Sequence, residues 1–227
     1  MPDLSLSMFE DVFFPPHVYK DGAIDTTPFV LKQPVCFNMH DMAPLKSITF
    51  VVFDFETTGL NAKHDHIVEL GAIRMDSSET KEFSTLIDPS VTISKHITSI
   101  SGITQKMLIG QPKAADVIPK FLSFIEGSVL VAHNADFDMK FLRINCERIG
   151  LDLRWPAVCT LKMARALLPN LKRKNLDTLA SHYGLTFESR HRSIGDVKVT
   201  CDVFSNLLSH LGKSENVVWK DLKPFIS

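Results

Sequence analysis

Two acids in the segment Phe53-Asp54-Phe55-Glu56 are the first residues whose type and spacing could do chemistry. They follow an apolar run that begins at Ile48 and is typical of a buried strand. Side chains at i and i+2 of a strand share a face, so Asp54 and Glu56 would point the same way. Two such carboxylates repel one another unless a proton or a cation lies between them, and hard divalent metals favour oxygen ligands. The pair indicates a metal site, unless the strand has already ended and both side chains are solvated.

A second polar group follows the next buried strand, in the segment His133-Asn134-Ala135-Asp136-Phe137-Asp138. Ligand sites of open α/β sheets occur at such strand–helix junctions. Asp136 and Asp138 cannot both face one site from a helix, because two residues turn by about 200°. Asp136 suits the N-cap, and the alternative for both acids is that they only complement the helix dipole. We expect His133 to be a structural hydrogen-bonding residue rather than a metal ligand.

The third group is His191-Arg192-Ser193-Ile194-Gly195-Asp196. In a continuous helix His191 and Asp196 would lie about 140° apart and would not converge. They converge if His191 lies in a loop and the helix begins near Ser193. A loop histidine with a near-neutral pKa is a suitable general base. The alternative is that Ser193 and Asp196 only form a capping box and that His191 is an idle surface residue.

Alternating elements must position these three groups. The apolar pattern predicts strands at about 48–55, 66–75, 82–87, 128–132 and 157–161. It predicts helices at about 95–108, 114–126, 137–149, 161–168, 175–183 and 194–211. Strands first, followed by strands alternating with helices, predict an α/β domain with a mixed central β-sheet flanked by helices.

Composition places the chain of 227 residues among globular proteins, with 44% hydrophobic and 22% charged residues. No apolar run approaches the roughly 18–20 residues of a membrane span, and the N-terminus lacks the basic and apolar regions of a secretory signal. The four cysteines are far apart, so we expect buried thiols rather than disulfides or a zinc site. These features predict a cytoplasmic protein with no membrane partner.

The pattern divides the chain into three parts. Residues 1–47 contain six of the twelve prolines and no helical or strand period, which predicts an N-terminal arm that docks on the domain or orders on a partner. Residues 48–212 form the predicted domain, and residues 213–227 are a C-terminal tail. A stretch from 154 to 198 holds nine basic and three acidic residues. It is interpreted as a phosphate track or, equally, as an ordinary solvated surface.

The order of the three motifs resembles the DEDDh (DnaQ-like) family of 3′→5′ exonucleases, over about residues 48–211. Phe53-Asp54-Phe55-Glu56-Thr57-Thr58-Gly59-Leu60 matches the first family motif in full. The similarity is greatest to the proofreading exonucleases of the epsilon type that serve bacterial DNA polymerase III. A sister group carries Tyr four residues before the last acid, where this chain has Arg192, so His191 indicates the histidine branch. Ser193 departs from the small apolar residue that is usual there.

The resemblance implies a ribonuclease H-like fold and a site that binds two divalent metal ions, Mg²⁺ or Mn²⁺. It selects Asp138 rather than Asp136, and it implies His191 as the general base. The implied metal ligands are Asp54, Glu56, Asp138 and Asp196. The implied substrate-binding residues are Thr57, Thr58, Gly59, Leu60, His133, Asn134 and Phe137. The implied substrate is a single-stranded or frayed DNA 3′ end.

Two alternatives stay open beside that interpretation. One is an RNA-directed 3′→5′ exoribonuclease of the same family, because metals engage the phosphate and not the sugar. The other is an inactive exonuclease fold used as a binding module, against which the intact set of acids argues. Candidate protein partners are a DNA polymerase and a sliding clamp. The segment Ser5-Leu6-Ser7-Met8-Phe9 resembles a clamp-binding peptide at three of five positions, but a hydrophobic strip tucked against the domain is the favoured interpretation.

Overall fold

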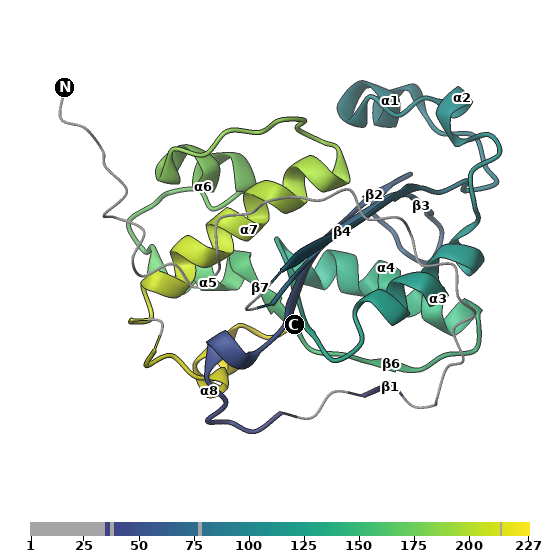
Figure 1. Ribbon diagram of the computed structural model, residues 1–227. Helices are drawn as coiled ribbons and strands as arrows, with labels where there is room; N and C mark the ends of the chain where they lie inside the picture. Colours follow the sequence, from purple (N-terminus) through teal and green to yellow (C-terminus); the bar gives the residue numbers. More distant parts are fainter. Residues whose placement is uncertain (1–34, 37–38, 77–78, 214) are drawn as a thin grey trace.

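A five-stranded mixed sheet forms the middle of the molecule in the computed structural model, which describes residues 35–36, 39–76, 79–213 and 215–227 (Figure 1). Its strand order is β4-β3-β2-β5-β7. Strand β3 is antiparallel to both β2 and β4, whereas β5 is parallel to β2 and to β7. The strands are β2 (Phe50–Thr57), β3 (Ile67–Met75), β4 (Thr80–Leu86), β5 (Val129–Ala132) and β7 (Ala157–Cys159).

Helices cover both faces of the sheet (Figure 1). One face carries α5 (Thr160–Leu167), α6 (Leu176–Tyr183) and α7 (Ser193–Ser209), and α7 packs directly on β2 and β3. The other face carries α3 (Ala114–Phe124) and α4 (Ala135–Arg148). The short helices α1 (Lys95–Ser101) and α2 (Gln105–Leu108) lie beyond the end of the sheet. Outside the sheet, β1 (Val35–Cys36) pairs with β6 (Leu153–Arg154).

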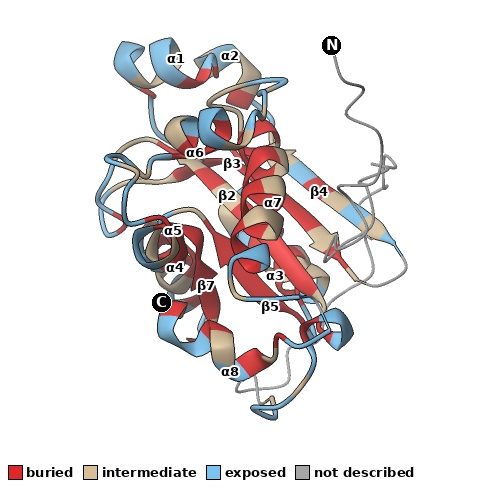
Figure 2. Ribbon diagram, turned by 90° about the vertical axis from the view of Figure 1, so that its left-hand side faces the viewer, coloured by how far each residue is buried: buried red, intermediate tan, exposed pale blue. Residues whose placement is uncertain are grey.

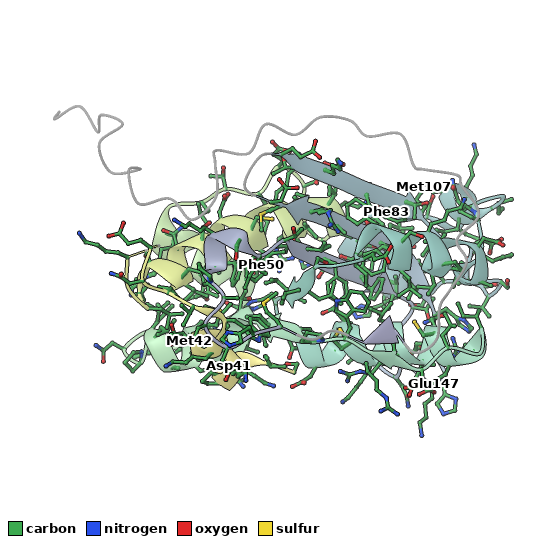
Figure 3. All side chains as sticks on the ribbon, turned by 60° about the horizontal axis from the view of Figure 1, so that its bottom comes forward. Asp41, Met42, Phe50, Phe83, Met107 and Glu147 are labelled. Carbon is green, nitrogen blue, oxygen red and sulfur yellow. The ribbon has the colours of Figure 1, made fainter. Side chains whose placement is uncertain are left out.

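Strand alternation divides the apolar side chains into two cores. Phe50 and Val52 of β2 belong to the core beneath α7, where the ring of Phe50 lies 5.2 Å from that of Phe204. Val51 and Phe53 belong to the core beneath α3 and α4. The middle strands of the sheet are accordingly buried (Figure 2). The side chain of Phe50 lies in the interior of the molecule, whereas that of Glu147 lies at its periphery (Figure 3). Even-numbered residues of β2 therefore face α7.

The predicted α/β class and mixed sheet are confirmed, but several elements differ from the prediction, among them the short β1, β6 and α8 (Trp219–Leu222), which the sequence pattern did not predict. The expected helix at 95–108 is two helices, because Gly102 ends α1 in a left-handed conformation with a φ of 71°. Strand β2 continues to Thr57, two residues beyond the predicted end. Helix α4 begins at Ala135, so the prediction that Asp136 is its N-cap is wrong: the N-cap is Asn134, with a φ of 65°.

The C-terminal residues 215–227 pack on the core that α7 covers. They form α8 (Trp219–Leu222) and a 3-10 helix (Lys223–Phe225), and Trp219, Leu222 and Phe225 are buried. The 3-10 helix Leu45–Ser47 lies beside them, since Trp219 donates a backbone hydrogen bond to Ala43 at 2.9 Å. The division at residues 47 and 213 stays a prediction. Residues 1–34, with the clamp-like segment at 5–9, lie outside the described residues.

Two predictions from composition are tested within the described residues. Cys146, Cys159 and Cys201 are buried free thiols, as expected. No helix in the described ranges is long and apolar enough to cross a membrane.

Candidate active site

Asp54 and Glu56 converge with Asp196, although 140 residues of chain separate Glu56 from Asp196. Asp54 and Glu56 lie within β2 on the face toward α7, and Asp196 lies in the first turn of α7. One carboxylate oxygen from each of the three lies within 4.8 Å of the other two. The alternative that the strand ends before these acids is wrong, because β2 continues through Thr57. The shared face predicted for Asp54 and Glu56 is confirmed.

Asp138 reaches the same region from the opposite face of the sheet. It is 2% exposed, and its Oδ1 accepts a hydrogen bond of 3.2 Å from the backbone N–H of Phe55 in β2. It lies close enough to Asp54 to raise the pKa of that carboxyl. Asp136 is exposed and lies 3.7 Å from the Nζ of Lys162. Of the two acids at the start of α4, the structure therefore directs Asp138 to the carboxylate cluster and Asp136 to the surface.

Helix α7 begins between His191 and Asp196, which is the condition under which the two side chains could converge. The helix begins at Ser193, and His191 lies in the preceding loop with a φ of 59°. The alternative of a capping box between Ser193 and Asp196 is wrong, because Ser193 is the first helical residue and Arg192 holds the N-cap position. The Oγ of Ser193 is buried and has no hydrogen-bond partner in the described part of the chain. Asp196 is 5% exposed, and one of its carboxylate oxygens lies within 4.8 Å of oxygens of Asp54 and Glu56.

The electrostatics of the four acids fit a bound cation. Burial raises the pKa of Glu56 to about 8, and the charge of Asp196 adds to the effect. Burial also raises the pKa of Asp138 to about 8 and that of Asp196 to about 6, and the pKa of Asp54 lies well above its usual range. The Oδ1 of Asp196 is buried without a hydrogen-bond partner among the described residues. Clustered oxygen donors that hold protons in the absence of a cation suit a hard divalent ion.

Arg190 supplies the positive charge beside these acids. Its guanidinium makes an ion pair with Oδ2 of Asp196 and a two-bond contact with Asp177, at 2.7 and 3.0 Å. It also lies 4.9 Å over the ring of Phe187 and 3.2 Å from Nδ1 of His191. Burial and the charge of Arg190 hold the pKa of His191 below its ordinary value, which favours the neutral imidazole. Sequence reasoning counted Arg190 only as one of nine basic residues.

His133 makes the structural contact expected of it. Its Nδ1 lies 2.9 Å from the Oγ1 of Thr160. Burial, with the charge of Arg190, lowers the pKa of His133 to about 4. A backbone hydrogen bond at Lys174 and the charge of Arg165 also act on the pKa of this ring, so Arg165 and Lys174 of the basic segment lie near His133.

The loop after β2 is tied to itself by hydrogen bonds. The Oγ1 of Thr57 donates to the carbonyl of Gly59 at 2.6 Å, and the Oγ1 of Thr58 donates to Asp65 at 3.2 Å. Asp65 also accepts from the backbone N–H of Asn61 at 2.8 Å. These contacts present Leu60 to solvent, with 87% of it exposed. On the other side of the site, Asn134 is exposed, and Phe137 is half-buried with its ring 5.0 Å from that of Phe141.

The sequence analysis assigned no role at the site to four residues that make side-chain contacts around it: Glu69, Asp65, Asp177 and Arg190. One of them carried a local signal, since Glu69 is a lone acid in the apolar run of β3. Asp65, Asp177 and Arg190 act through side-chain contacts that no short sequence motif indicates.

The chain is similar in sequence to known proteins. A family model, RNase_T, described as an exonuclease, matches residues 51–204. The chain is 42% identical over 171 residues to the PolC-type DNA polymerase III of Clostridium perfringens, in a match that covers 75% of this chain and 12% of that relative. It is 36% identical over 165 residues to the DNA polymerase III subunit epsilon of Aquifex aeolicus, which covers 72% of this chain and 82% of the relative.

A solved structure shares the fold. Exonuclease I of E. coli, in complex with a dT13 oligonucleotide, matches with a TM-score of 0.63 and 19% identity, over 72% of this chain and 41% of that one. Together with the observed sheet and the family match, this confirms the expected ribonuclease H-like fold. The chain spans only 12–13% of the length of the first PolC-type relatives, so it corresponds to one domain of those proteins.

Proposed function

This chain belongs to the RNase_T exonuclease family and is a nuclease, and we propose that it removes nucleoside 5′-monophosphates from the 3′ end of single-stranded or frayed DNA. The observation that carries the proposal is the convergence of Asp54, Glu56 and Asp196, with Asp138 directly behind them. Water adds to the terminal phosphorus, the bond to the 3′ oxygen of the preceding nucleotide breaks, and that oxygen leaves as a hydroxyl.

The four acids would hold divalent ions, which we propose to be two Mg²⁺ or Mn²⁺. When bound, such ions make water a stronger acid and stabilise negative charge on a leaving oxygen. The fit rests on the donor set, which is all carboxylate, and on the buried Oδ1 of Asp196 that lacks a partner among the described residues. Members of exonuclease families of this kind generally use divalent metals, and the carboxylate cluster supports the same requirement here.

His191 is the proposed acceptor of the proton from the attacking water. It lies in the loop before α7, half-buried, and its lowered pKa keeps the imidazole neutral near pH 7. A neutral imidazole accepts a proton, and a positioned general base accelerates such a step by roughly 10²–10⁴-fold. The positive charge of Arg190, whose guanidinium lies 3.2 Å from Nδ1 of His191, disfavours protonation of the imidazole before the reaction.

The residues around the loop after β2 would hold the 3′-terminal nucleotide. Leu60 stands out from a loop stiffened by Thr57, Thr58 and Asp65, and an exposed apolar side chain at that point suits contact with a base. Thr57, Thr58 and Gly59 would contribute backbone contacts. Asn134, His133 and the half-buried Phe137, which lie at or just before the start of α4, would contact the nucleotide from the opposite side.

DNA is the proposed substrate rather than RNA. Two relatives are named as DNA polymerase III proteins, and a solved relative holds a dT13 oligonucleotide. The basic segment near residues 165–174 lies beside His133 and would follow the phosphates. We further propose a DNA polymerase as the partner, on the basis of the relatives' names alone. A sliding clamp is a weaker proposal, which fails if deletion of residues 1–10 leaves clamp binding unchanged.

The test is a time course on matched 5′-labelled single-stranded DNA and RNA with Mg²⁺, Mn²⁺ or EDTA. We expect metal-dependent shortening from the 3′ end, faster on DNA and absent in Asp54→Ala. Asp136→Asn is the matched control, because it removes a nearby but exposed acid of α4. Faster loss of RNA would favour the exoribonuclease alternative. No cleavage with any metal would favour the inactive binding module and overturn the proposal.

A further inference from the structure

Glu69 of β3 holds the N-terminus of α7 from a distance of more than 120 residues in the chain. It is 1% exposed, yet it carries a carboxylate. Both of its oxygens accept from the guanidinium of Arg192, with Nε at 3.0 and 3.2 Å, and Oε2 also accepts from the backbone N–H of Ser193 at 2.9 Å. Arg192 offers no side-chain cap of its own. The carboxylate of Glu69 therefore performs the capping function that a residue of the helix normally performs.

The contact between β3 and α7 is close as well as charged. A Cβ atom at Gly71 would lie 2.7 Å from the backbone of Ser193 and Ile194. Gly71 is paired with Asp54 in the β2–β3 ladder, and Glu69 is paired with Glu56. The two contact points of β3 thus lie directly beside the two acids of β2. The first turn of α7 is positioned against the residues with which Asp196 must converge.

Arg192 also balances charge at this point. Glu56 and Glu69 lie opposite each other on one face of neighbouring strands, where like charges destabilise a sheet. The guanidinium of Arg192 lies against Glu69, and the charges of Glu69 and Glu56 both raise the pKa of Arg192. It therefore offsets the repulsion while leaving the carboxylate of Glu56 available to a cation.

We propose that the Glu69–Arg192 pair is a positioning device that sets His191 and Asp196 against the β2 carboxylates. Glu69 bonds to Arg192 and to the backbone of Ser193, which are neighbours of the reacting groups. His191 directly precedes Arg192, and Asp196 lies in the first turn of α7. Glu69 itself contacts neither substrate nor metal in this scheme. The inference rests on the proposed function of His191 and Asp196.

A merely structural role would have a different signature. Helix α7 has 17 residues, and its buried apolar side chains, such as Val203, Phe204 and Leu207, hold it to the sheet without help from Glu69. Loss of the pair should loosen the first turn and leave the rest of the helix packed. The chemical step should then slow more than substrate binding weakens, because a displacement of about 1 Å can cost 10²-fold in rate.

The experiment compares Glu69→Gln and Arg192→Lys with wild type in two measurements. The first is the single-turnover rate on single-stranded DNA and the DNA dissociation constant. The second is amide hydrogen exchange of residues 190–197 and 203–208 in the metal-free protein. Leu222→Ala is the matched control, because it truncates a buried side chain of α8 away from the site and costs roughly 2–5 kcal/mol of stability.

We expect Glu69→Gln to slow cleavage by about 10- to 100-fold, to change the DNA dissociation constant by less than about threefold, and to speed exchange only in 190–197. Arg192→Lys keeps the positive charge but loses the planar guanidinium, so we expect it to cleave more slowly than wild type and faster than Glu69→Gln. An unchanged rate per folded molecule in Glu69→Gln, or a loss no larger than in Leu222→Ala, overturns the proposal.

The exchange measurement keeps this inference separate from the proposed function. If wild type cleaves nothing, the proposed function fails. Faster exchange confined to 190–197 in Glu69→Gln would still support the positioning role of the Glu69–Arg192 pair, and unchanged exchange there would overturn it.

Discussion

The carboxylate cluster is built from two halves that the molecule holds in different ways. Asp54 and Glu56 lie in a strand paired to β3 along most of its length and to β5 at its start, so the backbone ladders set their positions. Asp196 and His191 lie at a helix start that depends on side chains: Glu69 on Ser193, and Arg190 on Asp196. The β2 half is determined by main-chain hydrogen bonds, and the α7 half by a few long-range polar contacts.

This difference indicates where the site is vulnerable. A substitution in the β2 half removes charge but leaves geometry in place, since the ladders do not depend on the side chain. A substitution around α7 moves groups that are themselves unchanged. The α7 half also contains the left-handed residue His191 and the close packing of Gly195 on Ser189, so its backbone has less room to adjust.

Among the variants that compare the two halves and keep all four acids, Gly195→Ala has the largest expected effect. The added Cβ would lie 2.0 Å from the carbonyl oxygen of Ser189, so the loop that carries Arg190 and His191 must move. We expect at least about a 100-fold loss of nuclease rate and a destabilisation of about 1–3 kcal/mol, measured by single-turnover cleavage and urea unfolding. Gly59→Ala is the comparison in the β2 half, since its Cβ meets the Asp65 side chain rather than backbone. Equal losses in the two variants would contradict the distinction between the halves.

The pH dependence of stability in the metal-free protein should reveal the acids of the cluster whose pKa is raised. Burial raises the folded-state pKa of Glu56 and of Asp138 to about 8, from ordinary values of 4.5 and 3.8. The folded protein therefore keeps protons that the unfolded chain releases, and its stability falls as pH rises from about 4 to about 8. In EDTA we expect the Tm to fall by several degrees over that range, and Mn²⁺ to restore most of it at pH 8.

The control for the pH experiment is Asp138→Asn, which should make the profile less steep because one of the four acids with a raised pKa is gone. A Tm in EDTA that stays constant or rises between pH 5 and pH 8 would argue against the raised pKa values.

A smaller effect is expected at Arg190. Its guanidinium and a metal ion would both seek the carboxylate of Asp196, so Arg190→Met should tighten Mn²⁺ binding by a few-fold while it lowers the stability of the metal-free protein. Calorimetric titration with Mn²⁺ measures the first effect and urea unfolding the second. Lys198→Met, which removes a partly exposed cation that pairs with Glu188, is the control. Weaker Mn²⁺ binding in Arg190→Met than in the control would contradict the competition.

The smallest effect concerns Ser193. Its buried Oγ has no partner among the described residues, and an unsatisfied buried hydroxyl costs roughly 1–3 kcal/mol. Ser193→Ala keeps the shape of the turn and removes that cost. We expect a Tm higher by about 2–4 °C with an unchanged cleavage rate, measured by thermal unfolding and single-turnover assay. A Tm below wild type would show that the hydroxyl has a stabilising partner.

Much of this site could be predicted before the fold was known, because its strongest signals are local. The period of a strand places Asp54 and Glu56 on one face whatever surrounds them. The incompatibility of His191 and Asp196 within one helix required a helix start near Ser193, and α7 begins there. The order of the motifs indicated the family, which the comparisons confirm.

Tertiary structure decided what local geometry could not. Helix geometry alone left the choice between Asp136 and Asp138 open; the family resemblance selected Asp138, and in the folded protein Asp138 bonds to β2 while Asp136 is exposed. The capping box at Ser193 failed because Glu69, 124 residues earlier, already accepts its N–H. A sequence specifies the periodicity of each element through short-range sterics and hydrogen bonds. Which charged groups meet depends on how the elements pack, and that is settled only when burial removes water from all of them together.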